Sequence, residues 1–277
     1  IHTKKEKRGT MLELQWLLAY AGLGALVGLL AGLFGIGGGG VMVPVLTMLF
    51  VAQGFPPEHL VHMALATSMA AIVPTALASL RAHHSHGAVL WPVVMRMTPG
   101  ILLGTFAATF LASLIAAKPL AIFFALFMSF VALQLFLDRK PKPSRQLPGT
   151  VGLSTAGVGI GGISALVAIG GGSLTVPFLA WCNVAVPVAI GTSAAAGLPV
   201  ALAGALGYLI NGWQTPGLPA YTLGFIYWPA VISIAALSLV TAPLGARLAH
   251  RLPVKILKKL FGVLSLLLAL QMLRTVI

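Results

Sequence analysis

Hydrophobic residues fall into ten stretches, five on each side of a short polar and basic connection at 138–146. An apolar run of about 20 residues is long enough to cross a bilayer as a helix. Most of the stretches approach this length, whereas 40–53 and 173–186 are too short to span upright. The pattern predicts an all-α, polytopic membrane protein with roughly eight to ten membrane segments. The expected segments are 14–34, 40–53, 60–80, 89–112, 119–137, 151–168, 173–186, 188–210, 223–245 and 258–276.

The two groups of five stretches carry the same marks in the same order. Each has a glycine cluster leading to Val-Pro, then Thr-Ser with a proline seven residues after the threonine, then Trp-Pro, then Ala-Leu-Gln. The matched blocks are 37–44 with 170–177, 67–74 with 192–199, 91–92 with 228–229, and 132–134 with 269–271. The chain is therefore interpreted as a duplication, with repeats at 11–137 and 147–277 joined by a basic linker at 138–146. Residues 1–10 precede the first methionine and are left out of this fold prediction.

Composition agrees with a membrane protein: 58% of residues are hydrophobic, 8% are charged and the mean hydropathy is +1.01. Most of the net charge of +13 lies in the N-terminal tail and short loops, which is typical of membrane topology and does not indicate nucleic-acid binding. None of the four acids lies within an apolar run, which disfavours a membrane-embedded enzyme. The single cysteine excludes an internal disulfide and a multi-thiolate metal site. No cofactor or metal is expected.

The basic loops favour an inverted relation between the repeats. If each repeat crosses an odd number of times, the linker 138–146 and the basic loop 246–259 face the same side, opposite loops that are nearly free of charge. Parallel repeats would remove this bias. The positive-inside rule therefore predicts inverted topology with both termini outside the cytoplasm. Whether the glycine-broken hairpins cross the membrane or re-enter is left open.

The glycine clusters are the first candidate binding feature. Glycine turns let backbones pack closely, and the helix that follows each cluster begins near Val41 or Leu174. A helix start carries partial positive charge and free N–H donors, so two of them meeting near the bilayer centre would bind an anion without a charged side chain. Hydroxyl groups of the two Thr-Ser pairs would add donors. The candidate residues are Gly37, Gly38, Gly39, Thr67, Ser68, Gly170, Gly171, Gly172, Thr192 and Ser193.

Two alternatives stay open for these residues. Glycine also permits close packing of membrane helices, and Ser or Thr often bonds back to its own helix. Further candidates are the paired Gln134 and Gln271, which otherwise read as headgroup-level or helix-packing residues, and Arg81, which otherwise belongs to an interfacial cationic loop. A metal site at His83 and His86 is disfavoured because no carboxylate or cysteine is near. His62 has no counterpart and is interpreted as a loop-end residue.

The run 31–39, with Val43-Pro44 and 66–68, resembles the first half of the TauE/SafE family, and 170–172, 176–177 and 191–193 resemble the second half. Ala168 is a departure, because the first half has Gly35 at the matching place. The resemblance implies a bacterial inner-membrane permease that exports sulfite or an organosulfonate such as sulfoacetate, with a small sulfur anion and membrane lipid as partners. A passive anion channel, or a permease for another small anion, is the alternative. The sequence leaves open whether the protein forms a homodimer.

Overall fold

The computed structural model describes residues 2–34, 38–137, 145–249 and 254–276. Within these ranges the chain forms ten α-helices and a hairpin of two-residue strands. Eight of the helices are long and apolar enough to cross a membrane. The all-α, multi-pass prediction is therefore confirmed. The long helices are α1 (His2–Phe34), α3 (Leu60–Ser85), α4 (Trp91–Leu114), α5 (Ala117–Leu137), α6 (Thr150–Val167), α8 (Val186–Gly212), α9 (Trp228–Ala249) and α10 (Val254–Val276).

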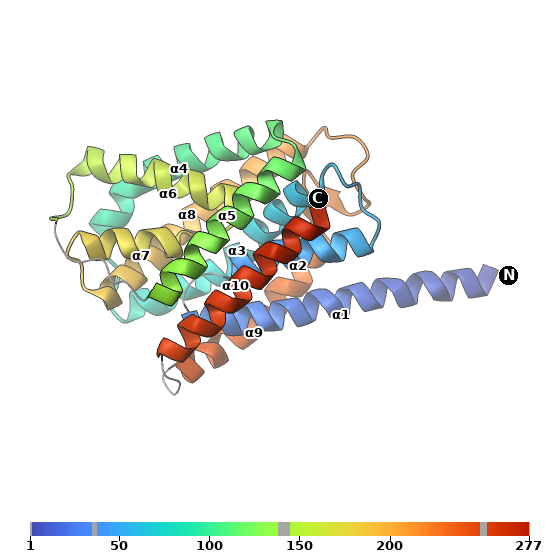
Figure 1. The fold of residues 1–277 in the computed structure, drawn as a ribbon, viewed down its shortest axis with the longest axis horizontal. Coiled ribbons are helices and arrows are strands. Elements are labelled where there is room, and N and C mark those ends of the chain that lie inside the picture. The colour runs from blue at the N-terminus through green and yellow to red at the C-terminus, as the bar shows by residue number, and fades with distance from the viewer. Residues whose placement is uncertain (1, 35–37, 138–144, 250–253, 277) are drawn as a thin grey trace.

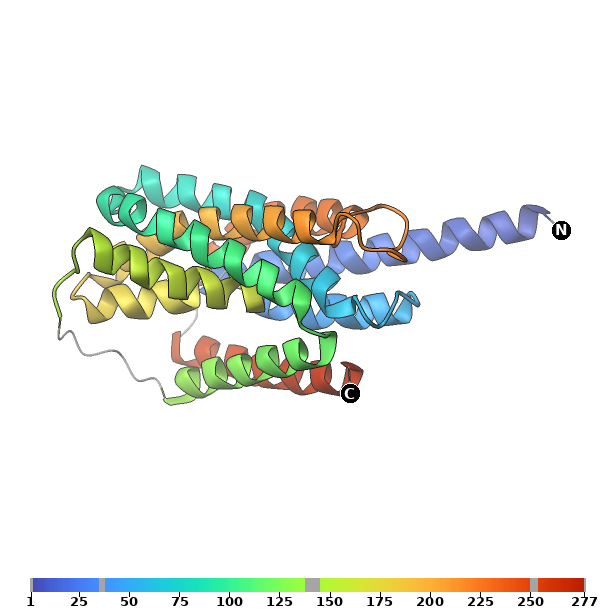
Figure 2. The ribbon, with the colours of Figure 1, turned by 90° about the horizontal axis from the view of Figure 1, so that it is seen from above.

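The helices lie in a bundle with their axes roughly along one direction, and the N-terminal part of α1 extends beyond it (Figure 1). The helices α5 and α10 pack on each other along one side of this bundle and run in opposite directions (Figures 1 and 2). The short helices α2 (Gly39–Ala52) and α7 (Gly172–Trp181) pack against α3 and α8 respectively. The helices α3 and α8 also pack on each other, so they form the centre of the molecule.

The two halves exchange packing partners. In the described residues, α1 packs chiefly on α9, whereas α6 packs chiefly on α4. Glycines make both contacts possible, because a Cβ at Gly24 would lie 2.5 Å from the carbonyl oxygen of Ile234, and one at Gly157 would lie 2.5 Å from that of Met97. Small residues let membrane helices approach this closely. The packing role expected as an alternative for glycine is thus observed on these helices.

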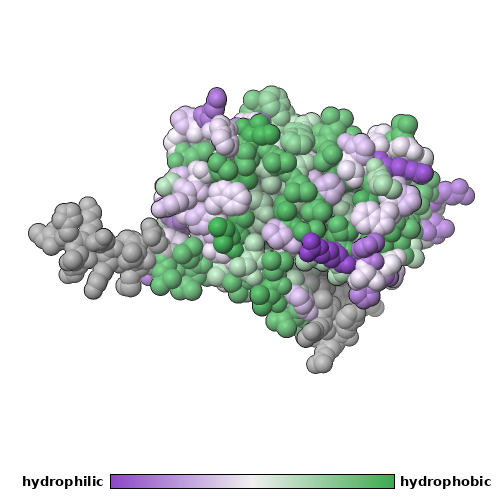
Figure 3. All heavy atoms as spheres, turned by 180° about the vertical axis from the view of Figure 1, so that it is seen from behind, coloured by the Kyte–Doolittle hydropathy of each residue, from purple (hydrophilic) through white to green (hydrophobic). Residues whose placement is uncertain are grey.

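The outer surface of the bundle is apolar, as lipid contact requires. Figure 3 shows hydrophobic side chains across the middle of one face and hydrophilic side chains mostly toward its ends. Exposed leucines are found on several outer helices, for instance Leu103 on α4 and Leu126 on α5. Arg96 is also exposed but lies in the second turn of α4, from which a long side chain reaches the membrane interface.

Several boundaries differ from the sequence prediction, and three of them change the local structure that was expected. The helix α3 continues to Ser85, so the stretch expected as a loop after residue 80 is helical. The helix α7 ends at Trp181, where Asn183 takes a left-handed conformation (φ 62°) that terminates it. The strands β1 (Thr222–Leu223) and β2 (Ile226–Tyr227) pair as an antiparallel hairpin where a helix was expected, because Gly224 turns the chain at φ 56°.

Candidate functional site

Each glycine cluster produces the same local structure. Gly38 (φ 69°) and Gly171 (φ 76°) are left-handed N-caps of α2 and α7. Their carbonyl oxygens accept the first backbone bonds of each helix, from Val41 at 3.1 Å and from Leu174 at 3.2 Å. Only glycine adopts such a conformation without a steric cost. The sequence-predicted helix starts are thus observed in both halves, while Gly37 lies outside the described residues.

The start of α2 lies against the glycine turn of the other half. A Cβ at Gly39 would lie 1.8 Å from the carbonyl oxygen of Ala168, the C-cap of α6. Ile72 of α3 lies against both clusters, 3.1 Å from the Cβ position of Gly39 and 3.6 Å from that of Gly170. The backbones of the two clusters therefore meet in the core. Ala168 adopts φ 49°, and its counterpart Gly35 lies outside the described residues.

Thr67 and Thr192 are fully buried and make reciprocal bonds between the halves. The hydroxyl oxygen of Thr67 accepts the backbone N–H of Tyr227 at 3.1 Å, and that of Thr192 accepts the backbone N–H of Leu90 at 3.0 Å. Tyr227 directly precedes α9, and Leu90 is the N-cap of α4. Each threonine thus satisfies an amide at a helix start of the other half, and its hydroxyl hydrogen remains available to an acceptor. For these two residues, the alternative of a bond to their own helix is wrong.

Other buried hydroxyl groups lie in or near the same elements. Ser68 and Ser193 are buried beside the two threonines. The hydroxyls of Ser68, Ser164, Ser173 and Thr175 have no hydrogen-bond partner within the described part of the chain. Buried polar atoms without a partner are uncommon. Thr105 on α4 and Ser265 on α10 are also without one in the described residues, so three of these hydroxyls lie in the α6–α7 region and the others on separate helices. Sequence reasoning missed Ser173 and Thr175 although they stand in a matched block, because Gly40 and Met42 replace them in the first half.

The remaining sequence candidates lie elsewhere. Gln134 is exposed and Gln271 half-buried, each near the C-terminal end of its helix, so the antiparallel α5 and α10 place them at opposite ends. Arg81 is exposed near the end of α3. Trp91 donates its indole N–H to Nδ1 of His84 at 3.2 Å. In the described residues, no three His, Cys, Asp or Glu side chains gather as metal ligands.

His62 lies in the first turn of α3 and is only 4% exposed, so it is a buried helical residue and not a loop end. Its Nε2 lies 3.0 Å from the carbonyl oxygens of both Ala112 and Ile115, at the end of α4. Its Nδ1 is buried without a partner among the described residues. The burial of His62 was not predicted, because a lone histidine at the start of an apolar segment has the sequence pattern of an interfacial residue.

An aromatic cluster lies where α1, α2, the loop between α2 and α3, and β2 come together. It consists of Tyr20, Phe50, Phe55 and Tyr227, with the ring of Tyr227 5.8 Å from Phe50 and 5.2 Å from Phe55. Gln53 donates to the hydroxyl of Tyr20 beside it. These residues come from distant parts of the chain, so no sequence motif indicated them.

Comparison with known proteins assigns the chain to a family. The model of the family described as sulfite exporter TauE/SafE matches residues 20–272. The chain belongs to the TauE/SafE family. A probable membrane transporter protein of Haemophilus influenzae is 37% identical over 255 residues, which cover 90% of this chain and 95% of that protein. One of Methanocaldococcus jannaschii is 26% identical over 267 residues, covering 92% and 97%. No solved structure matches.

The family confirms the resemblance stated from the sequence. This TauE/SafE chain is a multi-pass membrane protein of a transporter family, not of an enzyme family, with relatives in bacteria and archaea.

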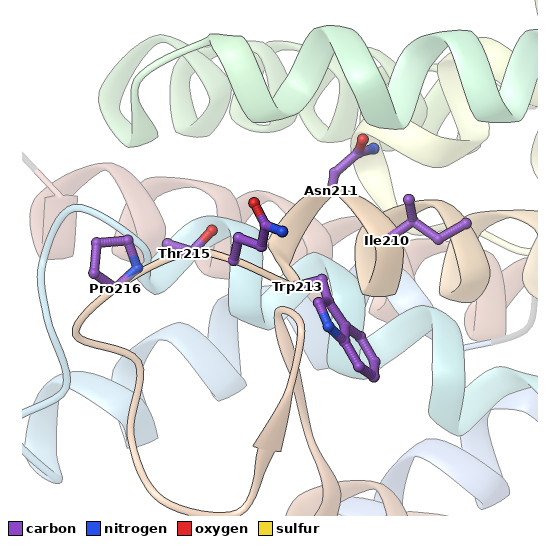
Figure 4. A pocket seen from close by; sticks show the side chains of 6 residues that line it. Ile210, Asn211, Trp213, Thr215 and Pro216 are labelled. Atoms are coloured by element: carbon purple, nitrogen blue, oxygen red, sulfur yellow. The ribbon is translucent and has the colours of Figure 1, made fainter.

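An open hollow of about 600 Å³ lies away from the glycine turns of this TauE/SafE protein. It is formed by the end of α8 and the loop that follows, and no charged side chain lines it (Figure 4). None of the sequence-predicted site residues belongs to it. Its lining residues are Ile210, Asn211, Trp213, Gln214, Thr215 and Pro216. The buried hydroxyls and glycine turns, which carry paired features from both halves, form the better candidate site.

Proposed function

We propose that the protein is a permease that exports a small sulfur oxyanion, sulfite or an organosulfonate such as sulfoacetate, across the bacterial inner membrane. The family description as sulfite exporters supports this substrate class. The observation that carries the mechanism is the pair of reciprocal bonds, Thr67 with Tyr227 and Thr192 with Leu90, together with the two glycine-led helix starts whose backbones meet in the core.

The proposed site binds the anion with backbone dipoles and hydroxyl groups. Helix N-termini attract anions through their unpaired N–H groups and the partial charge of about +0.5 at each helix start. In the described residues, the first amides of α7, at Gly172 and Ser173, make no hydrogen bond to a backbone carbonyl. The hydroxyl hydrogens of Thr67 and Thr192 complete the set of donors. A sulfur oxyanion offers several acceptor oxygens, so such a set matches it without any charged side chain.

The proposed repeats, 11–137 and 147–277, have inverted topology. The exchanged contacts of α1 with α9 and of α6 with α4 support this relation, as do the antiparallel directions of α5 and α10. The basic linker and the basic loop 246–259 then face the cytoplasm together. Under this arrangement the two cross-half bonds lie on opposite sides of the paired glycine turns, the Thr192 bond on the cytoplasmic side and the Thr67 bond on the outer side.

Burial of the site favours a carrier over a passive channel. Thr67, Ser68, Thr192 and Ser193 are at most 2% exposed. An anion therefore reaches them only after one end of the protein opens. Because a bacterial inner membrane is negative inside, its potential drives an exported anion outward. The carrier predicts saturable flux and counterflow in proteoliposomes, whereas a channel predicts neither.

The decisive experiment measures uptake into inside-out membrane vesicles. Sulfite, sulfoacetate, sulfolactate and thiosulfate are tested singly and in competition, with acetate as a carboxylate control and vesicles lacking the protein as the blank. Saturable uptake of at least one sulfur anion, with weaker uptake of acetate, supports the proposal. Equal uptake of acetate would favour a permease for other small anions, and linear uptake without counterflow would favour a channel.

A further inference from the structure

His62 differs from every other buried side chain of the described residues. It is the one histidine, acid or basic residue among them that is buried. It belongs to a candidate membrane span, α3, which has no other ionisable residue in its buried portion. Intramembrane ionisable residues are costly and are usually retained for function.

The contacts of the ring define its protonation. Both neighbours of Nε2, the carbonyl oxygens of Ala112 and Ile115, can only accept hydrogen bonds, so Nε2 carries a hydrogen. Nδ1 is buried without a partner within the described residues. A second proton on Nδ1 would make no hydrogen bond of normal geometry in the closed arrangement, although the backbone carbonyl of Glu58 lies near the ring, and a donor buried in this way is unfavourable. The closed arrangement therefore fits the neutral ring.

The end of α4 nevertheless favours the charged ring. Ala112 lies in the last turn of α4, and Ile115 is its C-cap. A helix C-terminus carries about half a negative charge and stabilises a cation beside it. Burial favours the neutral ring and so opposes the helix end. Because histidine normally titrates between about pH 5 and 8, small effects of this kind are enough to change its charge.

The ring also supports the β1–β2 hairpin of the other half. Phe225, between the two strands, packs on His62 with ring centroids 5.4 Å apart. Five residues further along α3, Thr67 accepts the amide of Tyr227 at the end of the same hairpin. Tyr227 in turn belongs to the aromatic cluster. A change at His62 thus acts on the hairpin through Phe225.

Few other ionisable groups face this place. His59 precedes α3, and its ring centroid lies 6.4 Å from that of His62. Glu58 is exposed in the same loop, and Lys118 is exposed at the start of α5, after the end of α4. The hairpin segment contributes Tyr221 and Tyr227 and no charged residue.

We propose that His62 is a proton-binding site: a proton taken from water at the hairpin end onto Nδ1 releases Phe225, opens the hairpin and so makes anion release pH-dependent. The inference rests on the proposed export function. It differs from coupling through an acid, because the membrane segments described here contain none.

The test follows opening without any substrate. In a Cys182→Ser background, Ala66→Cys places a thiol at a buried position beside Thr67, and Ser85→Cys gives an exposed reference thiol on α3. A small polar methanethiosulfonate reagent is applied between about pH 5 and 8, the range in which histidine titrates. The ratio of the two labelling rates removes the reagent's own pH dependence. We expect this ratio to rise severalfold on acidification.

His62→Gln is the key variant, because its side-chain N–H reaches the same carbonyls and does not titrate. We expect a flat ratio in this variant and an unchanged rise in the matched control His59→Gln. A flat ratio with His62 present, or a rise that persists in His62→Gln, overturns the proposal. The first of these outcomes is decisive even if His62→Gln does not fold. Flux of the same four sulfur anions, measured in the same proteoliposomes, separates the two claims: pH-dependent labelling without flux of any of them keeps the proton site and rejects the export function.

Discussion

The hydroxyl of Thr67 accepts a hydrogen bond from the backbone N–H of Tyr227 at 3.1 Å, across 160 residues of sequence. Its twin joins Thr192 to Leu90 across 102 residues. A side chain on a central helix of one half thus holds the amide of the residue just before an outer helix in the other half. Both threonines therefore have two tasks in the proposed carrier, which are to hold the halves together and to donate a hydrogen to the anion.

Thr67→Val and Thr192→Val keep the shape of the side chain and remove its oxygen. Each leaves a buried N–H without an acceptor, so we expect each to lower the free energy of unfolding by about 1–3 kcal/mol. Loss of a donor to a charged ligand should also weaken apparent affinity roughly ten- to a hundredfold. Thermal denaturation and flux in proteoliposomes measure the two effects. Thr→Ser at each position is the control that should keep both functions.

Valine variants that lose stability but transport sulfite with unchanged affinity would make the hydroxyls purely structural. The next candidates would then be the unpartnered Ser68 and Thr175, followed by Gln134, Gln271 and Arg81.

Substitutions in the glycine turns should act in a graded order. Alanine at any position near φ +70° costs about 1–2 kcal/mol from backbone conformation alone. A Cβ at Gly171 meets nothing closer than 3.6 Å, whereas at Gly38 it would lie 2.4 Å from Val27. We therefore expect Gly38→Ala to impair flux more than Gly171→Ala, and bulky residues at either place to abolish flux while the protein remains in the membrane.

Gly54→Ala is the matched control, because Gly54 has φ 73° and no neighbour within 4 Å of its Cβ position. It reports the cost of the backbone conformation without a contact at the site. Flux is compared at equal amounts of membrane-inserted protein. Wild-type flux in bulky variants of both Gly38 and Gly171 would show that these turns do not form the site.

Single-cysteine labelling tests the inverted topology. Gln146 is the last residue of the basic linker and Gln214 lies in the loop after α8; both are exposed. In a Cys182→Ser background, we expect Gln146→Cys to react with an impermeant reagent only in inside-out vesicles, and Gln214→Cys only in right-side-out vesicles. Labelling of both from the same side, or of Gln146→Cys from outside, would contradict the inverted arrangement.

The native thiol should react slowly. Burial raises the pKa of the Cys182 thiol, and the nearby Arg145 partly opposes this. A raised pKa means less thiolate at a given pH, so we expect Cys182 to be labelled more slowly than an exposed cysteine such as Gln146→Cys at pH 7, with a rate that increases as the pH rises. Arg145→Gln should raise the pKa of Cys182 further and slow its labelling. Faster labelling would show that easier access of the reagent to Cys182 outweighs the raised pKa.

Hydropathy located the helices well because membrane solvation selects long apolar runs with few charges. All ten expected stretches contain a helix, and Gly38 and Gly171 begin the two short ones as expected. The hairpin at 222–227 was missed because two-residue strands have no periodicity to detect. The extension of α3 to Ser85 was missed because polar residues such as Arg81 ended the apolar run before the helix ended.

The sequence predicted which paired residues belong to the candidate site. It did not predict the hydrogen bonds that these residues make. Internal repetition singled out Thr67 and Thr192, yet their partners are backbone amides, which carry no signature in sequence. Only the matched Trp-Pro pairs, which follow Leu90 and Tyr227, hinted that those places were equivalent. His62 was misjudged because its partners, the carbonyls of Ala112 and Ile115, are likewise backbone atoms.

The exchanged packing of α1 with α9 has a consequence for biosynthesis. When α1 enters the membrane, its main contact surface has not yet been translated, since α9 begins at Trp228. The glycine face of α1 must wait in lipid or against the insertion machinery until nearly the whole chain has emerged. Truncated nascent chains that end before α9 should therefore expose this face. Insertion of the late helices, rather than of the early ones, is then the step that commits the protein to its native assembly.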